Sequence, residues 1–83
     1  MWQIEYSSIA QRFIKLLDNK DKDRNMKSVE LLQTNPDLGK QLVGPLKGLR
    51  SLRSGRYRII YKKEINDLII LVVAVGHRKN IYR

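Results

Sequence analysis

The chain contains no cysteine and only one histidine, His77, among its 83 residues. Without thiols it can form neither a disulfide framework nor a thiolate metal site, and a lone histidine excludes a histidine-pair metal centre. We therefore expect a protein that uses no metal and no other cofactor. The lack of cysteine also fits a reducing compartment.

Long hydrophobic runs are missing as well. The longest apolar stretch, from Leu68 to Val75, has eight residues, whereas a membrane-spanning helix needs about 20. Polar residues from Gln3 to Arg12 interrupt the first apolar stretch, which is unlike a signal peptide. We expect a soluble, cytoplasmic protein that forms one domain over residues 1–83.

Acidic residues are scarce in the second half of the chain. Residues 1–39 hold six lysines and arginines and six acids, whereas residues 40–83 hold eleven basic residues and two acids. The whole net charge of +9 therefore lies in the second half. A surface charged only for solubility would mix both signs. The one-sided positive charge favours a polyanionic partner such as a nucleic acid.

The first half reads as one strand and two helices. Apolar and polar residues alternate over Trp2–Tyr6, which predicts a short strand. Ser8 and Gln11 then match a capping box, and the helix behind it carries an apolar stripe of Ile9, Phe13, Leu16 and Leu17. After a polar connection at 18–21, Asp21 is expected to cap a second helix over Lys22–Thr34, with Met26, Val29 and Leu32 facing the first helix.

The second half changes to the period of strands. Residues 37–48 are rich in glycine and proline and predict an ordered loop, followed by strands at 49–53, 56–63 and 68–75. The last strand is continuously apolar and is expected in the interior of a sheet. The order βααβββ predicts an α+β fold, with a helical hairpin on one face of a small, mainly antiparallel sheet. The first strand could lie at an edge or beside the last strand.

Arginines dominate one face of the predicted strand at 56–63. Alternation places Arg56 and Arg58 on the face opposite Tyr57, Ile59 and Tyr61. If the helices cover the tyrosines, the arginines remain open. With neighbouring residues, up to five guanidinium groups converge there: Arg50, Arg53, Arg56, Arg58 and Arg78. Guanidinium binds phosphate through paired hydrogen bonds, so this face suits an RNA backbone; the alternative is an ordinary solvated face.

Proton transfer has three candidates in the basic half, namely His77, Tyr82 and Lys79. Imidazole is the side chain whose ordinary pKa lies nearest neutrality, and fixed cations aimed at a phosphate stabilise the charge that grows on it in the transition state. The competing interpretation is that His77 lies on the surface and that Tyr82 packs at the core edge.

Two motifs carry a family resemblance. The run Leu46-Lys47-Gly48-Leu49-Arg50-Ser51-Leu52-Arg53-Ser54-Gly55-Arg56-Tyr57-Arg58-Ile59-Ile60-Tyr61 and the ending Val75-Gly76-His77-Arg78-Lys79-Asn80-Ile81-Tyr82-Arg83 resemble the signatures of the RelE/ParE toxin superfamily. The resemblance implies the same βααβββ fold and a toxin of a toxin–antitoxin pair, bound by a cognate antitoxin. For RelE-type members it implies metal-independent cleavage of mRNA in the ribosomal A site, with contacts to 16S ribosomal RNA.

The resemblance also implies roles for single residues. Arg58 and Arg78 would stabilise the phosphate, Tyr82 would assist proton transfer or stack on a base, and His77 occupies a position that is basic in relatives. The expected RNA-binding residues are Lys47, Arg50, Arg53, Arg56 and Lys79. Two alternatives stay open: a ParE-like poison of DNA gyrase without nuclease activity, and a non-catalytic module that binds RNA or the antitoxin.

Overall fold

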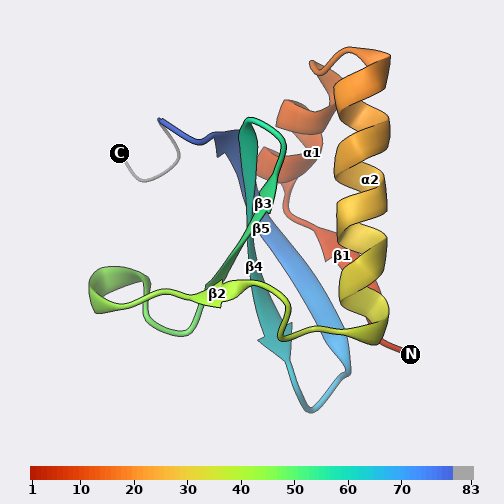
Figure 1. The fold of residues 1–83 in the computed structure, drawn as a ribbon. Coiled ribbons are helices and arrows are strands. Elements are labelled where there is room, and N and C mark those ends of the chain that lie inside the picture. The colour runs from red at the N-terminus through yellow and green to blue at the C-terminus, as the bar shows by residue number, and fades with distance from the viewer. Residues whose placement is uncertain (80–83) are drawn as a thin grey trace.

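The computed structural model describes residues 1–79. Its elements run in the order β1 (Gln3–Tyr6), α1 (Ser8–Lys15), α2 (Asn19–Thr34), β2 (Lys40–Gln41), a 3-10 helix η1 (Gly44–Leu46), β3 (Arg50–Ser54), β4 (Tyr57–Glu64) and β5 (Ile69–His77). Both helices lie on one side of the sheet, and the loop after β2 projects on the other side (Figure 1). The predicted α+β fold is confirmed.

The sheet has five strands in the order β1-β5-β4-β3-β2. The pairs β4/β5, β3/β4 and β2/β3 are antiparallel, whereas β1 runs parallel to β5. The first strand therefore lies both at an edge and beside the last strand. The segment predicted as a loop contains β2, whose two residues pair with Arg50 and Ser51, and then η1.

The core lies between α2 and the inner face of β4 and β5. Ile59 and Tyr61 of β4 are fully buried, as is Leu32 of α2, and Val29 is 2% exposed. Burial of these side chains is the main free-energy gain of the fold, at about 25 cal/mol per Å2 of apolar surface removed from water. The prediction that the helices cover the Tyr57/Ile59/Tyr61 face is confirmed. Of the residues predicted to face the first helix, Val29 shares a core cluster with Ala10 of α1 and with the sheet. Leu32 clusters with Tyr61 and Ile70 of the sheet, and Met26 is 40% exposed.

Helix α1 begins one residue before the predicted position. Ser7, not Ser8, is the N-cap, because its hydroxyl accepts the Ala10 N–H at 3.0 Å and donates to the Val73 carbonyl at 2.6 Å. The hydroxyl thus serves the helix and the sheet at once. The predicted apolar stripe is confirmed for Phe13 but not for Ile9 and Leu16, which are 67% and 83% exposed. Ala10 and Ile14 pack into the core beside Phe13.

Helix α2 begins at Asn19, three residues before the predicted start. The carboxylate of Asp18 caps it by accepting the Asp21 N–H at 2.8 Å. Asp21 therefore lies inside the first turn, where a negative charge interacts favourably with the helix dipole. The segment predicted as a polar connection is therefore mostly helix. Asp18 and Asp21 are both residues that can cap a helix, and Asp18 is the one that does so here.

A bulge between β4 and β5 decides which side chains share a face. Ile60 pairs with Ala74 but Tyr61 pairs with Val72, so Val73 is the extra residue. The inward positions of β5 change parity at this point, from Ile70 and Val72 before the bulge to Val75 after it. No helix within residues 1–79 is long and apolar enough to cross a membrane.

Candidate nucleic-acid interface

Two arginines lie opposite each other on the sheet face that the helices leave uncovered. Arg53 of β3 pairs with Arg58 of β4, and Arg58 pairs in turn with Gly76 of β5. The neighbouring pair Leu52/Ile59 points into the core, so alternation places the arginines on the other side. Arg53 is exposed and Arg58 is half-buried. The Arg58 guanidinium reaches the Ser51 hydroxyl at 3.5 Å.

This pair is electrostatically costly in the free protein, because like charges directly opposite each other destabilise a sheet. Within residues 1–79, the basic members of the ion pairs are Arg50, Lys62 and Lys63, and neither Arg53 nor Arg58 is among them. A phosphate bound between the two guanidinium groups would remove the repulsion. The pair therefore has the chemistry of an anion site.

Arg56 and Arg78 lie next to this pair along the two strands. Gly55 has a φ of +62°, a left-handed conformation that glycine adopts without strain, and its turn leads into the exposed Arg56. The backbone N–H of Arg78 donates to the Arg56 carbonyl at 3.0 Å, which extends the β4/β5 pairing beyond Tyr57 and His77. Four of the five expected arginines therefore belong to adjoining backbone segments: Arg53, Arg56, Arg58 and Arg78.

Arg50 does not belong to this cluster. It pairs with Tyr61, whose side chain is in the core, so it lies on the helix side of the sheet. There its guanidinium donates to the carbonyls of Gly39 (2.7 Å) and Asp37 (3.2 Å) and contacts the Asp37 carboxylate at 3.3 Å. The expectation that all five guanidinium groups converge is wrong for Arg50, because strand alternation turns it the other way.

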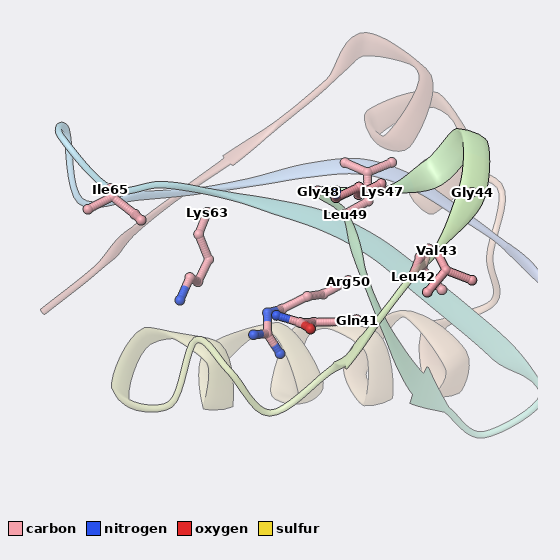
Figure 2. A pocket seen from close by; sticks show the side chains of 10 residues that line it. All are labelled: Gln41, Leu42, Val43, Gly44, Lys47, Gly48, Leu49, Arg50, Lys63 and Ile65. Carbon is pink, nitrogen blue, oxygen red and sulfur yellow. The ribbon is translucent and has the colours of Figure 1, made fainter.

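Lys47, Arg50 and Lys63 form a second basic region, which lines a pocket of about 670 Å3. Figure 2 shows Gln41, Arg50 and Lys63 extending to the same side of the sheet, with Ile65 beyond Lys63 and Lys47 at the loop. The remaining lining comes from the loop and the ends of its strands: Leu42, Val43, Gly44, Gly48 and Leu49. Lys47, expected to bind RNA, thus lies with Arg50 at this pocket and not in the arginine row of β3 and β4.

Asp37 and Lys63 are the charged residues of this region that the sequence analysis did not single out. The Lys63 ammonium and the Arg50 guanidinium contact the same oxygen, Oδ1, of Asp37. The hydrogen bond from Lys63 is the largest cause that lowers the pKa of Asp37. Desolvation opposes it, and the charges of Lys63 and then Arg50 lower the pKa further. The only sequence signal for Lys63 was its place on the tyrosine face of the strand.

His77 lies on the helix side of the sheet as well. It pairs with Tyr57, and the two rings make an edge contact with centroids 6.0 Å apart. Tyr57 also meets Phe13 of α1 edge-on at 5.9 Å and donates from its hydroxyl to Asp21 of α2 at 3.2 Å. Desolvation and then the charge of Asp21 raise the pKa of Tyr57. On its other side, Nδ1 of His77 accepts the Lys79 N–H at 3.3 Å.

The remaining expected residues are Lys79 and Tyr82. Lys79 is exposed at the end of the described chain, and Tyr82 lies outside the described residues. Residues 1–79 contain no group of three or more histidine, cysteine or acidic side chains that could hold a metal ion.

The fold is shared with several solved toxins. A chain of the RelBE2 toxin–antitoxin complex of Mycobacterium tuberculosis superposes with a TM-score of 0.86 at 24% identity, covering 93% of this chain and 98% of that one. The isolated RelE toxin of E. coli gives 0.78 at 19% identity, covering 99% and 92%. YafQ of E. coli gives 0.71 at 24% identity, with both chains covered completely. At these identities the matches show the fold, which is that of RelE-type toxins.

Sequence comparison gives the family itself. Residues 2–82 match the ParE toxins of type II toxin–antitoxin systems (parDE). The chain therefore belongs to the ParE toxin family, within the superfamily that its two motifs resemble. Among curated proteins, none matches the sequence.

Proposed function

We propose that this toxin is a metal-independent endoribonuclease that cleaves mRNA in the ribosomal A site. The observation that carries the proposal is the pair of Arg53 and Arg58 on the uncovered sheet face, with Arg56 and Arg78 in the adjoining backbone. An RNA backbone is the polyanion that fits a row of guanidinium groups on an uncovered sheet face. Relatives of the same fold include RelE and YafQ of E. coli.

In the proposed reaction, the 2′-hydroxyl of one nucleotide attacks the adjacent phosphate and the bond to the 5′-oxygen of the next nucleotide breaks. The products are a 2′,3′-cyclic phosphate and a new 5′-hydroxyl. Arg58 and Arg78 stabilise the charge that grows on the phosphate, which is worth several kcal/mol when donors are preorganised. Tyr82, assisted by Lys79, takes the proton from the 2′-hydroxyl and donates a proton to the leaving 5′-oxygen. Arg53 and Arg56 hold the flanking phosphates.

The proposal includes a protein partner and a ribosomal one. Solved relatives were crystallised as RelB–RelE toxin–antitoxin complexes from M. tuberculosis, E. coli and Pyrococcus horikoshii. We infer that a cognate antitoxin binds this toxin in the cytoplasm and covers Arg58 and Arg78 or displaces the C-terminal segment. In the free toxin, exposed basic residues contact 16S ribosomal RNA. We expect the antitoxin to slow amide exchange in residues 49–79. Unchanged exchange there would contradict the proposed antitoxin contact.

A second candidate follows from the family match, whose description is that of ParE toxins. In that case the chain poisons DNA gyrase and carries no nuclease activity. His77 lies on the helix side of the sheet, so the arginine face has one proton-transfer group fewer. This placement favours the second candidate.

One experiment separates the two candidates. The toxin is induced in growing cells, and mRNA 5′ ends are mapped on translated and untranslated copies of one transcript. Cuts confined to translated codons, and abolished by Arg78→Ala, support the nuclease. Growth arrest with intact mRNA and accumulated gyrase–DNA cleavage complexes supports the poison, and no arrest supports a non-catalytic module.

A further inference from the structure

The backbone around Arg78 is held from two sides. The Arg78 N–H donates to the carbonyl of Arg56 at 3.0 Å, at the end of the neighbouring strand. One residue later, the Lys79 N–H donates to Nδ1 of His77 at 3.3 Å. The first bond aligns Arg78 with β4, and the second closes a short turn in which Arg78 is the middle residue. The direction in which the chain continues from Arg78 therefore depends on the position of the His77 ring.

The ring has a fixed position of its own. His77 contacts Tyr57 edge-on, and Tyr57 is held by Phe13 of α1 and by its hydrogen bond to Asp21 of α2. Asp21 and Asp18 from the start of α2, and Arg56 from the β3–β4 turn, are the charged groups acting on Tyr57. Side chains of both helices thus determine where the acceptor nitrogen of the turn lies.

The chemistry of imidazole makes this structural role incompatible with that of a base. A neutral ring has one N–H and one nitrogen with a free lone pair. Since Nδ1 accepts the Lys79 N–H, the proton is on Nε2, and the single lone pair is already in use. A general base needs that lone pair for the substrate proton. While the turn is closed, His77 cannot remove a proton from RNA.

We propose that His77 is a positioning residue, whose Nδ1 closes the turn that sets Arg78 beside Arg56 and Arg58. The inference deepens the proposed function, since it concerns the arginine that acts at the phosphate. It replaces the expectation that His77 itself transfers a proton. A displaced catalytic group costs up to about 100-fold in rate when it moves by about 1 Å, and loss of this turn has an effect of that order.

Three substitutions in the full chain isolate the Nδ1 contact. In His77→Asn, the side-chain Oδ1 occupies nearly the place of Nδ1 and also accepts a hydrogen bond. In His77→Gln, the acceptor is one bond farther out, and in His77→Ala there is none. Asparagine is therefore the conservative variant, and none of the three provides a general base at neutral pH.

The first measurement is amide exchange of Lys79 by NMR at neutral pH, expressed as a protection factor. The natural protein and His77→Asn are expected to show about tenfold protection that His77→Gln and His77→Ala lack. An unprotected Lys79 in the natural protein at neutral pH would overturn the proposal.

The second measurement is toxicity and mRNA cutting by the same variants, with thermal unfolding as a control for folding. We expect His77→Asn to retain activity within about threefold, and His77→Gln and His77→Ala to lose up to about 100-fold in kcat. If His77→Asn is as inactive as His77→Ala while its Lys79 stays protected, His77 is the base and the proposal fails. Growth arrest without RNA cutting would refute the nuclease function alone. The role of the turn would still be tested, because the three variants can be compared by how strongly each arrests growth.

Discussion

Arg53 and Arg58 face each other across β3 and β4, on the sheet side that neither helix covers. Two guanidinium groups in register on a sheet repel each other in the free protein, and the repulsion becomes useful only when an anion binds between them. The pair therefore opposes stability and favours binding, and the two effects can be measured separately.

Replacing Arg58 by alanine tests this opposition. We expect Arg58→Ala to change the free energy of unfolding by less than about 1 kcal/mol, with any change toward higher stability, because a like-charge pair is removed. RNA cutting should fall by about 100-fold to 1,000-fold, as expected for the loss of one preorganised donor to the phosphate. Urea denaturation and primer extension on a translated mRNA give the two quantities. A large loss of stability would mean that Arg58 is a structural residue.

The salt dependence of RNA binding distinguishes the two basic regions. Each phosphate contact to single-stranded RNA contributes about 0.7 to the slope of log K against log salt. Arg53→Ala should lower the magnitude of the slope by about that amount. Arg50→Ala serves as the matched control, because this guanidinium is held by Asp37 and Gly39 on the other side of the sheet. Fluorescence anisotropy with a short oligoribonucleotide gives both slopes, and equal changes would place RNA on both regions.

Asp37 makes stability depend on acidity. Its pKa lies below the ordinary value of 3.8, chiefly through the hydrogen bond from Lys63. Its contribution to stability is therefore complete above that value and is lost as the pH falls through the lowered folded-state pKa. Asp37→Asn should be less stable than the natural protein at neutral pH, and the difference should shrink toward about pH 2. Asp67→Asn, in the exposed β4–β5 turn, is the control and should leave stability at neutral pH unchanged.

Tyr61 connects the end of α2 to the sheet through its hydroxyl. The group donates to the Pro36 carbonyl at 2.7 Å and accepts the Gly39 N–H at 2.8 Å, in a fully buried side chain. Tyr61→Phe leaves both partners without a hydrogen bond and should cost about 1–3 kcal/mol. Tyr57→Phe loses one bond at a half-buried site and should cost about 1 kcal/mol or less. Urea midpoints with unchanged m-values would establish the difference, and equal costs would contradict it.

Local patterns in the sequence determined much of this structure. The alternation of Tyr57, Ile59 and Tyr61 with Arg58 follows from the period of a strand, and the helix covers the apolar set because burial of those rings lowers the free energy. The position of Arg53 opposite Arg58 follows from a tight β3–β4 turn at Gly55. Such features depend on neighbours in the chain, so the sequence alone was sufficient for them.

Other features depend on residues far apart in the chain, and only the tertiary structure decided them. Alternation turns Arg50 to the helix side, but its partner there, Asp37, is supplied by the loop after α2. His77 is the clearest case: continuing the parity of Ile70 and Val72 along β5 would place it on the arginine face, but the bulge at Val73 reverses the parity. An unbroken apolar strand contains no local signal for that extra residue, since it arises from how β5 pairs with β4. One inserted residue therefore turns His77 to the helix side, away from the arginines, where its Nδ1 accepts the Lys79 N–H.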